Sequence, residues 1–267
     1  MRKGTVCGWL WMLLLFLAWE TGHAGQSLKY KIIGGVPETE NYFSLSQLEE
    51  AAGVRVIASA YFDWALNYRN SRLHVISFAG LVARYHGGMG ADAVLLNCFD
   101  DYQGIVSLED IRRYDLQLAT RIEIAPEFKK PDWLNPLMII VPDGGRVPYR
   151  ERFVTANIRE IKFVRLEDYY APLKNIVRTA PEVESGLRAF KDNCLFCHSL
   201  RGVGGNKGVR LLDTYNFSGA LGRDRFRADF FAFHGKDNAD KQNLEQFVTS
   251  EEVREIGRFL RAASHSP

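Results

Sequence analysis

The stretch Asn193-Cys194-Leu195-Phe196-Cys197-His198 decides how the C-terminal part of this 267-residue chain is built. Two cysteines in C-x-x-C spacing, followed at once by histidine, form the attachment signature of a c-type haem. The two thiols add across the vinyl groups of the porphyrin, and the adjacent imidazole ligates the iron. We therefore predict that Cys194 and Cys197 hold one covalent haem c and that His198 is the proximal iron ligand.

A C-x-x-C pair also occurs in thioredoxin-like redox sites and in zinc sites. Zinc would need a second pair of ligands, and the two remaining cysteines, Cys7 and Cys98, form none. A thioredoxin-like pair belongs to a strand-containing βαβ unit, whereas the residues before Cys194 have a helical pattern. The haem interpretation is therefore preferred.

The N-terminus predicts export. A charged start is followed by an apolar run over residues 6–19, and small residues lead up to Ala24. This order is typical of a secretory signal peptide, here residues 1–24. An uncleaved anchor is the competing interpretation, but the run is shorter than the roughly 20 residues of a spanning helix. We expect a periplasmic protein without a stable membrane span, or a membrane-anchored one if the signal is not cleaved.

The composition limits the classes of binding partner that we expect. Removing the predicted signal takes away Arg2, Lys3 and Glu20 and changes the formal net charge from +2 to +1. A nearly neutral protein gives no reason to expect nucleic acid as a partner. After export Cys98 is the single cysteine outside the haem motif, so no intramolecular disulfide is expected. The remaining chain is long enough for two domains.

Residues 25–170 are predicted to form short apolar strands with short helices between them. Helices are predicted over residues 78–85 and 108–112, the second capped by Ser107 with Asp110 three residues on. Strands are predicted over residues 28–33, 54–61, 93–99, 116–120, 137–141 and 158–165. This mixture, in which strands dominate, indicates an α+β domain.

Residues 25–170 also resemble the oxidoreductase molybdopterin-binding domain, the sulfite-oxidase-like fold. The matching pieces, in order, are Phe78–Val82, Val94–Tyr102, Ser107–Asp110, Leu116–Ala119 and Asn135–Pro142. The resemblance implies that the molybdenum ligand is a cysteine upstream of Phe78, and residues 25–77 contain none. Cys98 lies further along, in a predicted strand. We therefore expect a molybdopterin-binding-like domain without the metal, and no molybdenum cofactor.

Two prolines, Pro172 and Pro181, predict a linker over residues 171–181, and residues 182–267 form the second predicted domain. A helix over residues 182–192 runs into the haem motif. A last helix follows Thr249, which can form a capping box with Glu252. Gly186 and Gly257 would let these two helices cross closely. The arrangement resembles class I monohaem cytochrome c, which implies a small all-α domain.

The resemblance implies a distal methionine, and the predicted haem domain has none, because the methionines are at positions 1, 12, 89 and 138. His234 lies between the haem motif and the last helix and follows a phenylalanine-rich run. We predict His234 as the distal iron ligand. Lys236, Lys241 and an open site remain as alternatives.

The leading hypothesis is an electron-transfer cytochrome whose N-terminal domain is a docking scaffold for a redox partner protein, and not a catalyst. One alternative is a sulfite-dehydrogenase-like molybdenum oxidoreductase with its own haem acceptor. A second alternative is a haem-based gas or redox sensor with an open distal site. Molybdenum content would separate the first alternative from the leading hypothesis, and carbon monoxide binding would separate the second.

Overall fold

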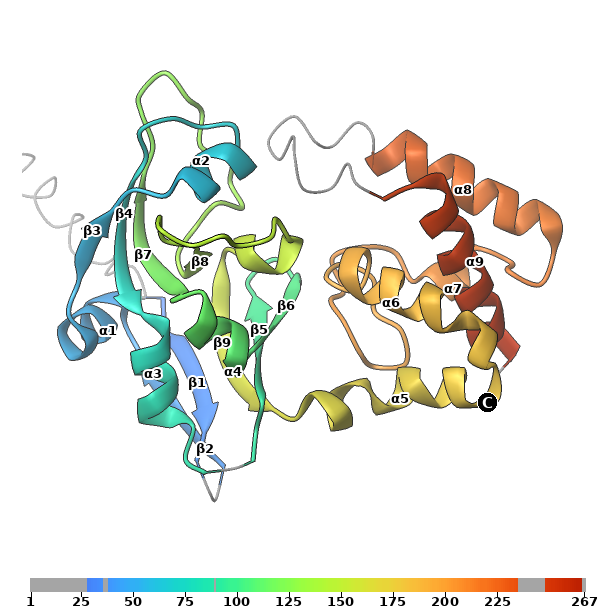
Figure 1. Cartoon of the computed structure of the whole chain (residues 1–267), viewed down its shortest axis with the longest axis horizontal. Helices are drawn as coiled ribbons and strands as arrows, with labels where there is room; N and C mark the ends of the chain where they lie inside the picture. The colour runs from blue at the N-terminus through green and yellow to red at the C-terminus, as the bar shows by residue number, and fades with distance from the viewer. Residues whose placement is uncertain (1–27, 36–37, 89, 235–247, 266–267) are drawn as a thin grey trace, which may run out of the picture.

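The computed structural model describes residues 28–35, 38–88, 90–234 and 248–265 (Figure 1). The predicted signal peptide lies outside the described residues. A β-rich N-terminal body and a helical C-terminal body lie side by side, joined by helix α5 (Leu166–Thr179). Within the described ranges, no helix is both long and apolar enough to cross a membrane.

The N-terminal body contains two mixed or antiparallel sheets. The larger has the strand order β2-β1-β9-β5-β6, in which β1 and β9 are parallel and the other neighbours are antiparallel. The smaller has the order β3-β4-β7-β8 and is antiparallel throughout. The strands are β1 (Tyr30–Gly34), β2 (Thr39–Phe43), β3 (Arg55–Ile57), β4 (Arg72–Ser77), β5 (Ala93–Cys98), β6 (Gln103–Ser107), β7 (Gln117–Glu123), β8 (Met138–Ile140) and β9 (Ile158–Val164).

Short helices connect these strands. They are α1 (Leu45–Ala52), α2 (Ala60–Ala65), α3 (Phe78–Tyr85), α4 (Leu108–Arg113) and the 3₁₀ helix η1 (Glu151–Val154). Helices and sheets share the first core, whose largest buried side chains include Phe62, Phe78 and Phe153. The body is thus mixed α and β, which is compatible with the predicted α+β class.

Local signals predicted the helix starts well. Ser107 Oγ accepts a hydrogen bond from Asp110 N–H at 2.9 Å and caps α4 as expected. The prediction of one strand over residues 54–61 is wrong, because the chain leaves the sheet after Ile57. Ser59 Oγ accepts the N–H of Phe62 at 3.0 Å and so starts helix α2 inside the predicted strand.

Strand β5 is buried on both faces, which explains its continuous apolar sequence. Val94 and Leu96 point into the first core, whereas Ala93 and Leu95 point into a second core. Successive side chains of a strand point to opposite faces of the sheet. The second core is built mainly by the C-terminal body, so that body packs directly against the larger sheet.

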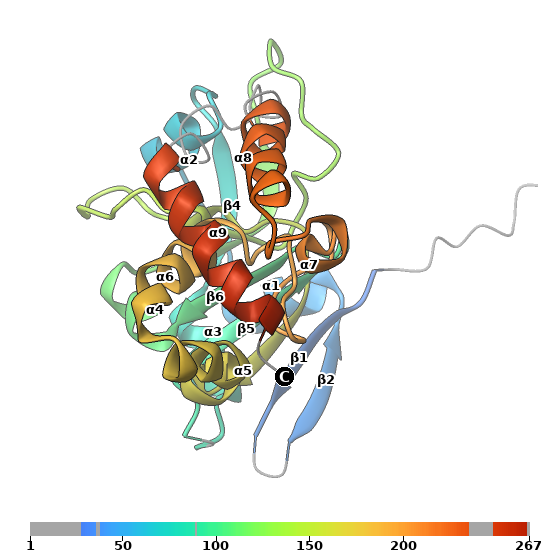
Figure 2. The same ribbon diagram turned by 90° about the vertical axis from the view of Figure 1, so that its right-hand side faces the viewer.

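The C-terminal body is helical in the residues described. Its elements after α5 are η2 (Pro181–Val183), α6 (Glu184–Asn193), α7 (Leu211–Thr214), α8 (Ala220–His234) and α9 (Ser250–His265). Figure 2 shows α9 running diagonally across α6. Thr249 Oγ1 accepts the N–H of Glu252 at 3.1 Å and Glu252 accepts the N–H of Thr249 at 2.7 Å, so the predicted capping box is confirmed.

The close crossing of α6 and α9 depends on one glycine and not on two. A Cβ added to Gly186 would lie 2.8 Å from the Cβ of Phe259, and the ring of Phe259 packs on Phe190 with centroids 5.6 Å apart. Gly257 has no described atom within 4 Å of such a Cβ. The expectation is therefore confirmed for Gly186 and wrong for Gly257.

A helix occupies the segment where two prolines predicted a linker. α5 continues through Pro172 to Thr179. A proline inside a helix costs about 3 kcal/mol. Three large side chains of α5, Tyr170, Leu173 and Ile176, are buried in the second core and offset this cost. The division into two domains itself stays a prediction.

Candidate haem site

The haem motif forms one tight turn at the end of α6. Cys194 N–H donates to Phe190 C=O at 2.9 Å, and His198 N–H donates to Cys194 C=O at 2.9 Å. The turn buries the Cys194 side chain, whereas Cys197 and His198 are half-buried. The helix therefore delivers both cysteines and the histidine as one compact group.

Hydrogen bonding fixes the tautomer of His198. Nδ1 lies 2.7 Å from the carbonyl oxygen of Val209, and because a carbonyl only accepts, Nδ1 carries the proton. Nε2 then keeps a lone pair, as a metal-binding imidazole requires. Burial lowers the pKa of His198, although the bond to Val209 opposes this, so the neutral ring is favoured.

Gly208 forms a cradle for the same imidazole. A Cβ at this position would lie 2.8 Å from Nε2 of His198 and closer still to other ring atoms. Any residue with a side chain would push the ring away. Gly208 N–H donates to Cys197 C=O at 2.8 Å, which holds the segment against the motif.

His234 faces His198 across the site. It is the last residue of α8, and the two imidazole centroids are 6.2 Å apart with the rings inclined at 78°. A metal bound by both rings, with metal–nitrogen distances of about 2 Å and ring radii of about 1.1 Å, would separate the centroids by about 6 Å. The separation of the two ring centroids therefore matches that of two imidazoles that share one metal ion. The alternative ligands Lys236 and Lys241 lie outside the described residues.

The phenylalanines in the segment 217–233 differ in their burial and in their contacts. Phe217 and Phe226 are buried together, with centroids 5.2 Å apart, and belong to the second core. Phe230 lies beside His234 with centroids 5.0 Å apart, and Phe231 contacts Phe230. Phe233 is 62% exposed and points away from the core. Phe230 is therefore the phenylalanine that contacts a candidate iron ligand directly.

The motif also docks into the N-terminal body, which the sequence did not predict. Phe196, between the two cysteines, is 4% exposed and belongs to the first core. Its ring stacks on Tyr102 with centroids 5.6 Å apart and an angle of 7°. Gln103 N–H donates to Phe196 C=O at 2.9 Å. Its neighbour Leu195 belongs to the second core, so the motif joins the two cores.

Cys98 does not fit a molybdenum thiolate. Its side chain is 1% exposed within β5, and burial, with a smaller contribution from Asp100, raises the pKa of the thiol. The group therefore stays protonated, whereas a metal ligand must be a thiolate. In the part of the chain that the structure describes, no group of three or more His, Cys, Asp or Glu side chains is placed to hold a metal ion.

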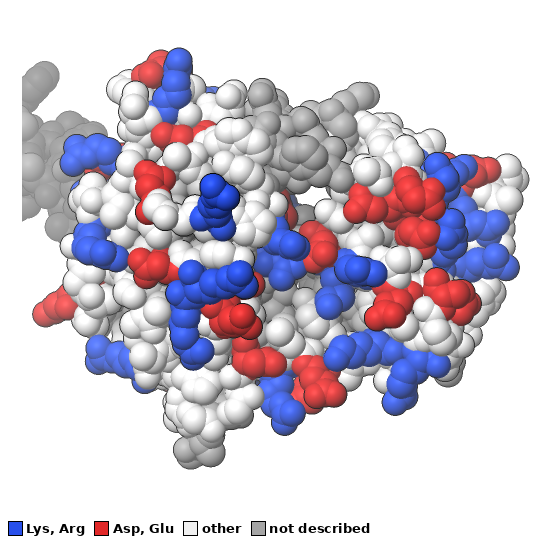
Figure 3. All heavy atoms as spheres, viewed as in Figure 1, with Lys and Arg blue, Asp and Glu red and all other residues white. Residues whose placement is uncertain are grey.

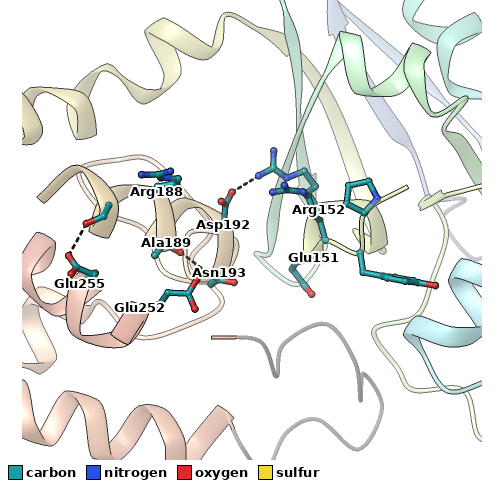
Figure 4. Close-up of a pocket in the computed structure, with 12 residues that line it drawn as sticks. Glu151, Arg152, Arg188, Ala189, Asp192, Asn193, Glu252 and Glu255 are labelled. Carbon is teal, nitrogen blue, oxygen red and sulfur yellow. Dashed lines mark hydrogen bonds and ion pairs between the residues drawn. The ribbon is translucent and has the colours of Figure 1, made fainter. Parts of the chain in front are cut away.

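A charged cleft of 470 Å³ lies between residues 148–152 of the N-terminal body and helices α6 and α9 (Figure 4). Arg152 and Asp192 form an ion pair of 2.6 Å across it, and Arg188 and Glu252 line it further out. Charges of both signs also alternate over the face shown in Figure 3. Neither feature has the single sign of charge that would select a polyanion or polycation.

Comparisons with known proteins find no match in sequence and a weak similarity in structure. No protein-family model matches the chain, and no curated protein sequence matches it. One similar solved structure is the sulfane dehydrogenase SoxCD from Paracoccus pantotrophus, with 13% sequence identity and a TM-score of 0.35. The similarity covers 54% of this chain and 40% of that chain, so it spans less than half of SoxCD.

Proposed function

We propose that this protein is an exported c-type cytochrome that transfers electrons through one haem attached covalently at Cys194 and Cys197. His198 and His234 are the residues that would hold its iron. When bound, the haem supplies a one-electron couple between ferric and ferrous iron. The chain supplies the two thiols, the two imidazoles and a body that docks a redox partner protein.

The observation that carries this proposal is the pair of facing imidazoles. His198 and His234 come from segments 36 positions apart, yet their centroids lie 6.2 Å apart. The carbonyl of Val209 holds the His198 ring in the tautomer that a metal ligand needs. Two imidazoles give a lower reduction potential than the histidine–methionine pair of ordinary cytochromes c. A distal site filled by His234 also disfavours a gas sensor.

The N-terminal body acts in this proposal as a scaffold and not as a second redox centre. Its one cysteine, Cys98, is a buried and protonated thiol within a strand. Tyr102 of the N-terminal body stacks on Phe196 and holds the haem motif against the larger sheet. A rigidly held haem needs little rearrangement when its charge changes, which suits electron transfer.

Absorption spectra of the purified full chain test the proposal. A pyridine haemochrome assay should give one covalent haem per chain. The wild type should be six-coordinate and low-spin in both oxidation states and should not bind carbon monoxide. His234→Ala should lose the low-spin bands in the ferrous state and bind carbon monoxide, because its distal position is open.

His265→Ala is the matched control. His265 lies in the same body, where its Nε2 hydrogen-bonds Ser218 Oγ at 3.0 Å, and its removal should leave the spectrum unchanged. Absence of covalent haem would refute the proposed function. Unchanged low-spin bands in His234→Ala would refute the distal ligand alone. Stoichiometric molybdenum in the purified protein would favour the oxidoreductase alternative.

A further inference from the structure

The turn between β5 and β6 reaches from the N-terminal body into the loop that follows the haem motif. Asp100 Oδ2 forms an ion pair of 2.7 Å with Lys207 Nζ. The next residue, Asp101, accepts the N–H of Asn206 on its carbonyl at 2.8 Å. Both side chains of the ion pair are partly shielded, with 27% and 43% of their surfaces exposed. The turn therefore binds two consecutive residues of the loop, Asn206 and Lys207.

The same loop holds the His198 imidazole. A Cβ on Gly205 would lie 2.8 Å from the carbonyl oxygen of Asp101, so the loop lies directly against the turn. From Lys207 the chain continues through Gly208, which lies against the His198 ring, to the Val209 carbonyl that accepts Nδ1–H. Only Gly208 lies between Lys207, which pairs with Asp100, and the residue that carries this carbonyl, Val209.

We propose that Asp100 and Asp101 are positioning residues for the proximal ligand: through Lys207 and Asn206 they hold the Val209 carbonyl on His198 Nδ1. Docking of the N-terminal body thereby sets the donor strength of His198 toward the haem iron. This inference rests on the proposed function. It assigns to the β-rich body a direct influence on the haem that a passive scaffold does not have.

The direction of the effect follows from the hydrogen bond. A carbonyl that accepts a hydrogen bond from Nδ1–H makes the other ring nitrogen a stronger electron donor. A stronger donor favours ferric iron and lowers the reduction potential. Loosening the loop should weaken this bond, weaken the donor and raise the potential.

The test is the double variant Asp100→Asn/Lys207→Gln in the haem-loaded full chain, measured by redox titration. It removes one charge of each sign, so the net charge stays constant. The ferrous form should gain at least about threefold over the ferric form at a fixed potential, which is about 28 mV at 59 mV per tenfold for one electron. Deleting the hydrogen-bond partner of a metal-ligating histidine typically lowers metal affinity or activity 10- to 100-fold. The effect expected here is smaller, because the carbonyl is displaced and not removed.

The two single variants separate positioning from simple charge. If the pair acts only as two charges, Asp100→Asn and Lys207→Gln shift the potential in opposite directions and the double variant returns to the wild-type value. If the pair positions the loop, the double variant keeps an upward shift. The electron paramagnetic resonance g values of the ferric form, which respond to axial ligand strength, should change in the double variant as well.

Arg152→Gln/Asp192→Asn is the matched control, because it removes another ion pair between the two bodies, of 2.6 Å and similar exposure. That pair does not touch the loop, so the potential should stay at the wild-type value. A wild-type potential and wild-type g values in the Asp100/Lys207 variant would overturn the inference and leave the proposed function standing. Absence of covalent haem in the wild type would overturn both.

Discussion

Replacing Gly186 by alanine tests the crossing of α6 and α9, because two opposing effects predict opposite signs. Alanine favours a helix over glycine by about 0.8–1.0 kcal/mol, so α6 by itself would gain stability. In the folded chain the new Cβ would lie 2.8 Å from the Cβ of Phe259 and closer still to the carbonyl oxygen of Glu255. Ordinary contacts of a Cβ begin at 3.4 Å.

The destabilisation by the clash should exceed the gain in helix propensity. The atoms that clash with the new methyl group are a backbone carbonyl and a Cβ, which cannot rotate away as the end of a long side chain can. The helices must therefore separate, and the packing of Phe190 on Phe259 loosens with them. Overpacking of this kind costs about 1–3 kcal/mol. After the gain in helix propensity is subtracted, Gly186→Ala should lower the free energy of unfolding by up to about 2 kcal/mol.

Gly257→Ala in the partner helix is the control. No described atom lies within 4 Å of a Cβ at this position, so the gain in propensity of up to about 1 kcal/mol should appear undiminished. Urea denaturation followed by circular dichroism at 222 nm would compare both variants with the wild type. A Gly186→Ala protein that unfolds at the wild-type urea concentration or above would refute the close helix crossing.

Two further predictions concern the contact between the bodies. Phe196→Ala should destabilise the full chain by about 3–5 kcal/mol in urea, because it empties a buried site and removes the stack on Tyr102; a loss no larger than that of the half-exposed Phe231→Ala would contradict the docking of the motif. Burial raises the pKa of Tyr102 well above its usual value of 10.0, so the folded chain keeps a proton that the unfolded chain loses, and stability should fall as the pH rises above about 10. Tyr102→Phe should flatten that fall in urea titrations between about pH 9 and about pH 11, and an unchanged slope would show that Tyr102 is not the group responsible.

Much of the local structure could be predicted because its causes are local. Ser107 starts α4 and Thr249 with Glu252 starts α9, since each cap needs only residues within one turn. The apolar run over residues 93–99 predicted a strand, and the structure places the alternate side chains of β5 in two cores. The haem motif is equally local, since it consists of six consecutive residues, and its chemistry stays a prediction.

The errors and omissions arise where distant parts of the chain decide. Pro172 indicated a linker, but the second core buries three side chains of α5 and keeps that segment helical. The 54–61 strand ends early because Ser59 caps α2, a local signal that the alternating pattern concealed. The docking of Phe196 on Tyr102 had no sequence signal other than an aromatic residue between two cysteines.

The sequence by itself determined the helix caps and predicted both the haem motif and His234 as the distal ligand, and these two stay predictions. Only the tertiary structure brought the His234 ring within 6.2 Å of the His198 ring and placed Asp100 and Asp101 on the haem loop. It also made Gly186 a close contact, whereas no described atom lies within 4 Å of a Cβ on Gly257. The two glycines look alike in sequence, since each interrupts the apolar face of a helix. Which of them matters depends on where the two helix axes cross, and the packing of the whole second core fixes that point.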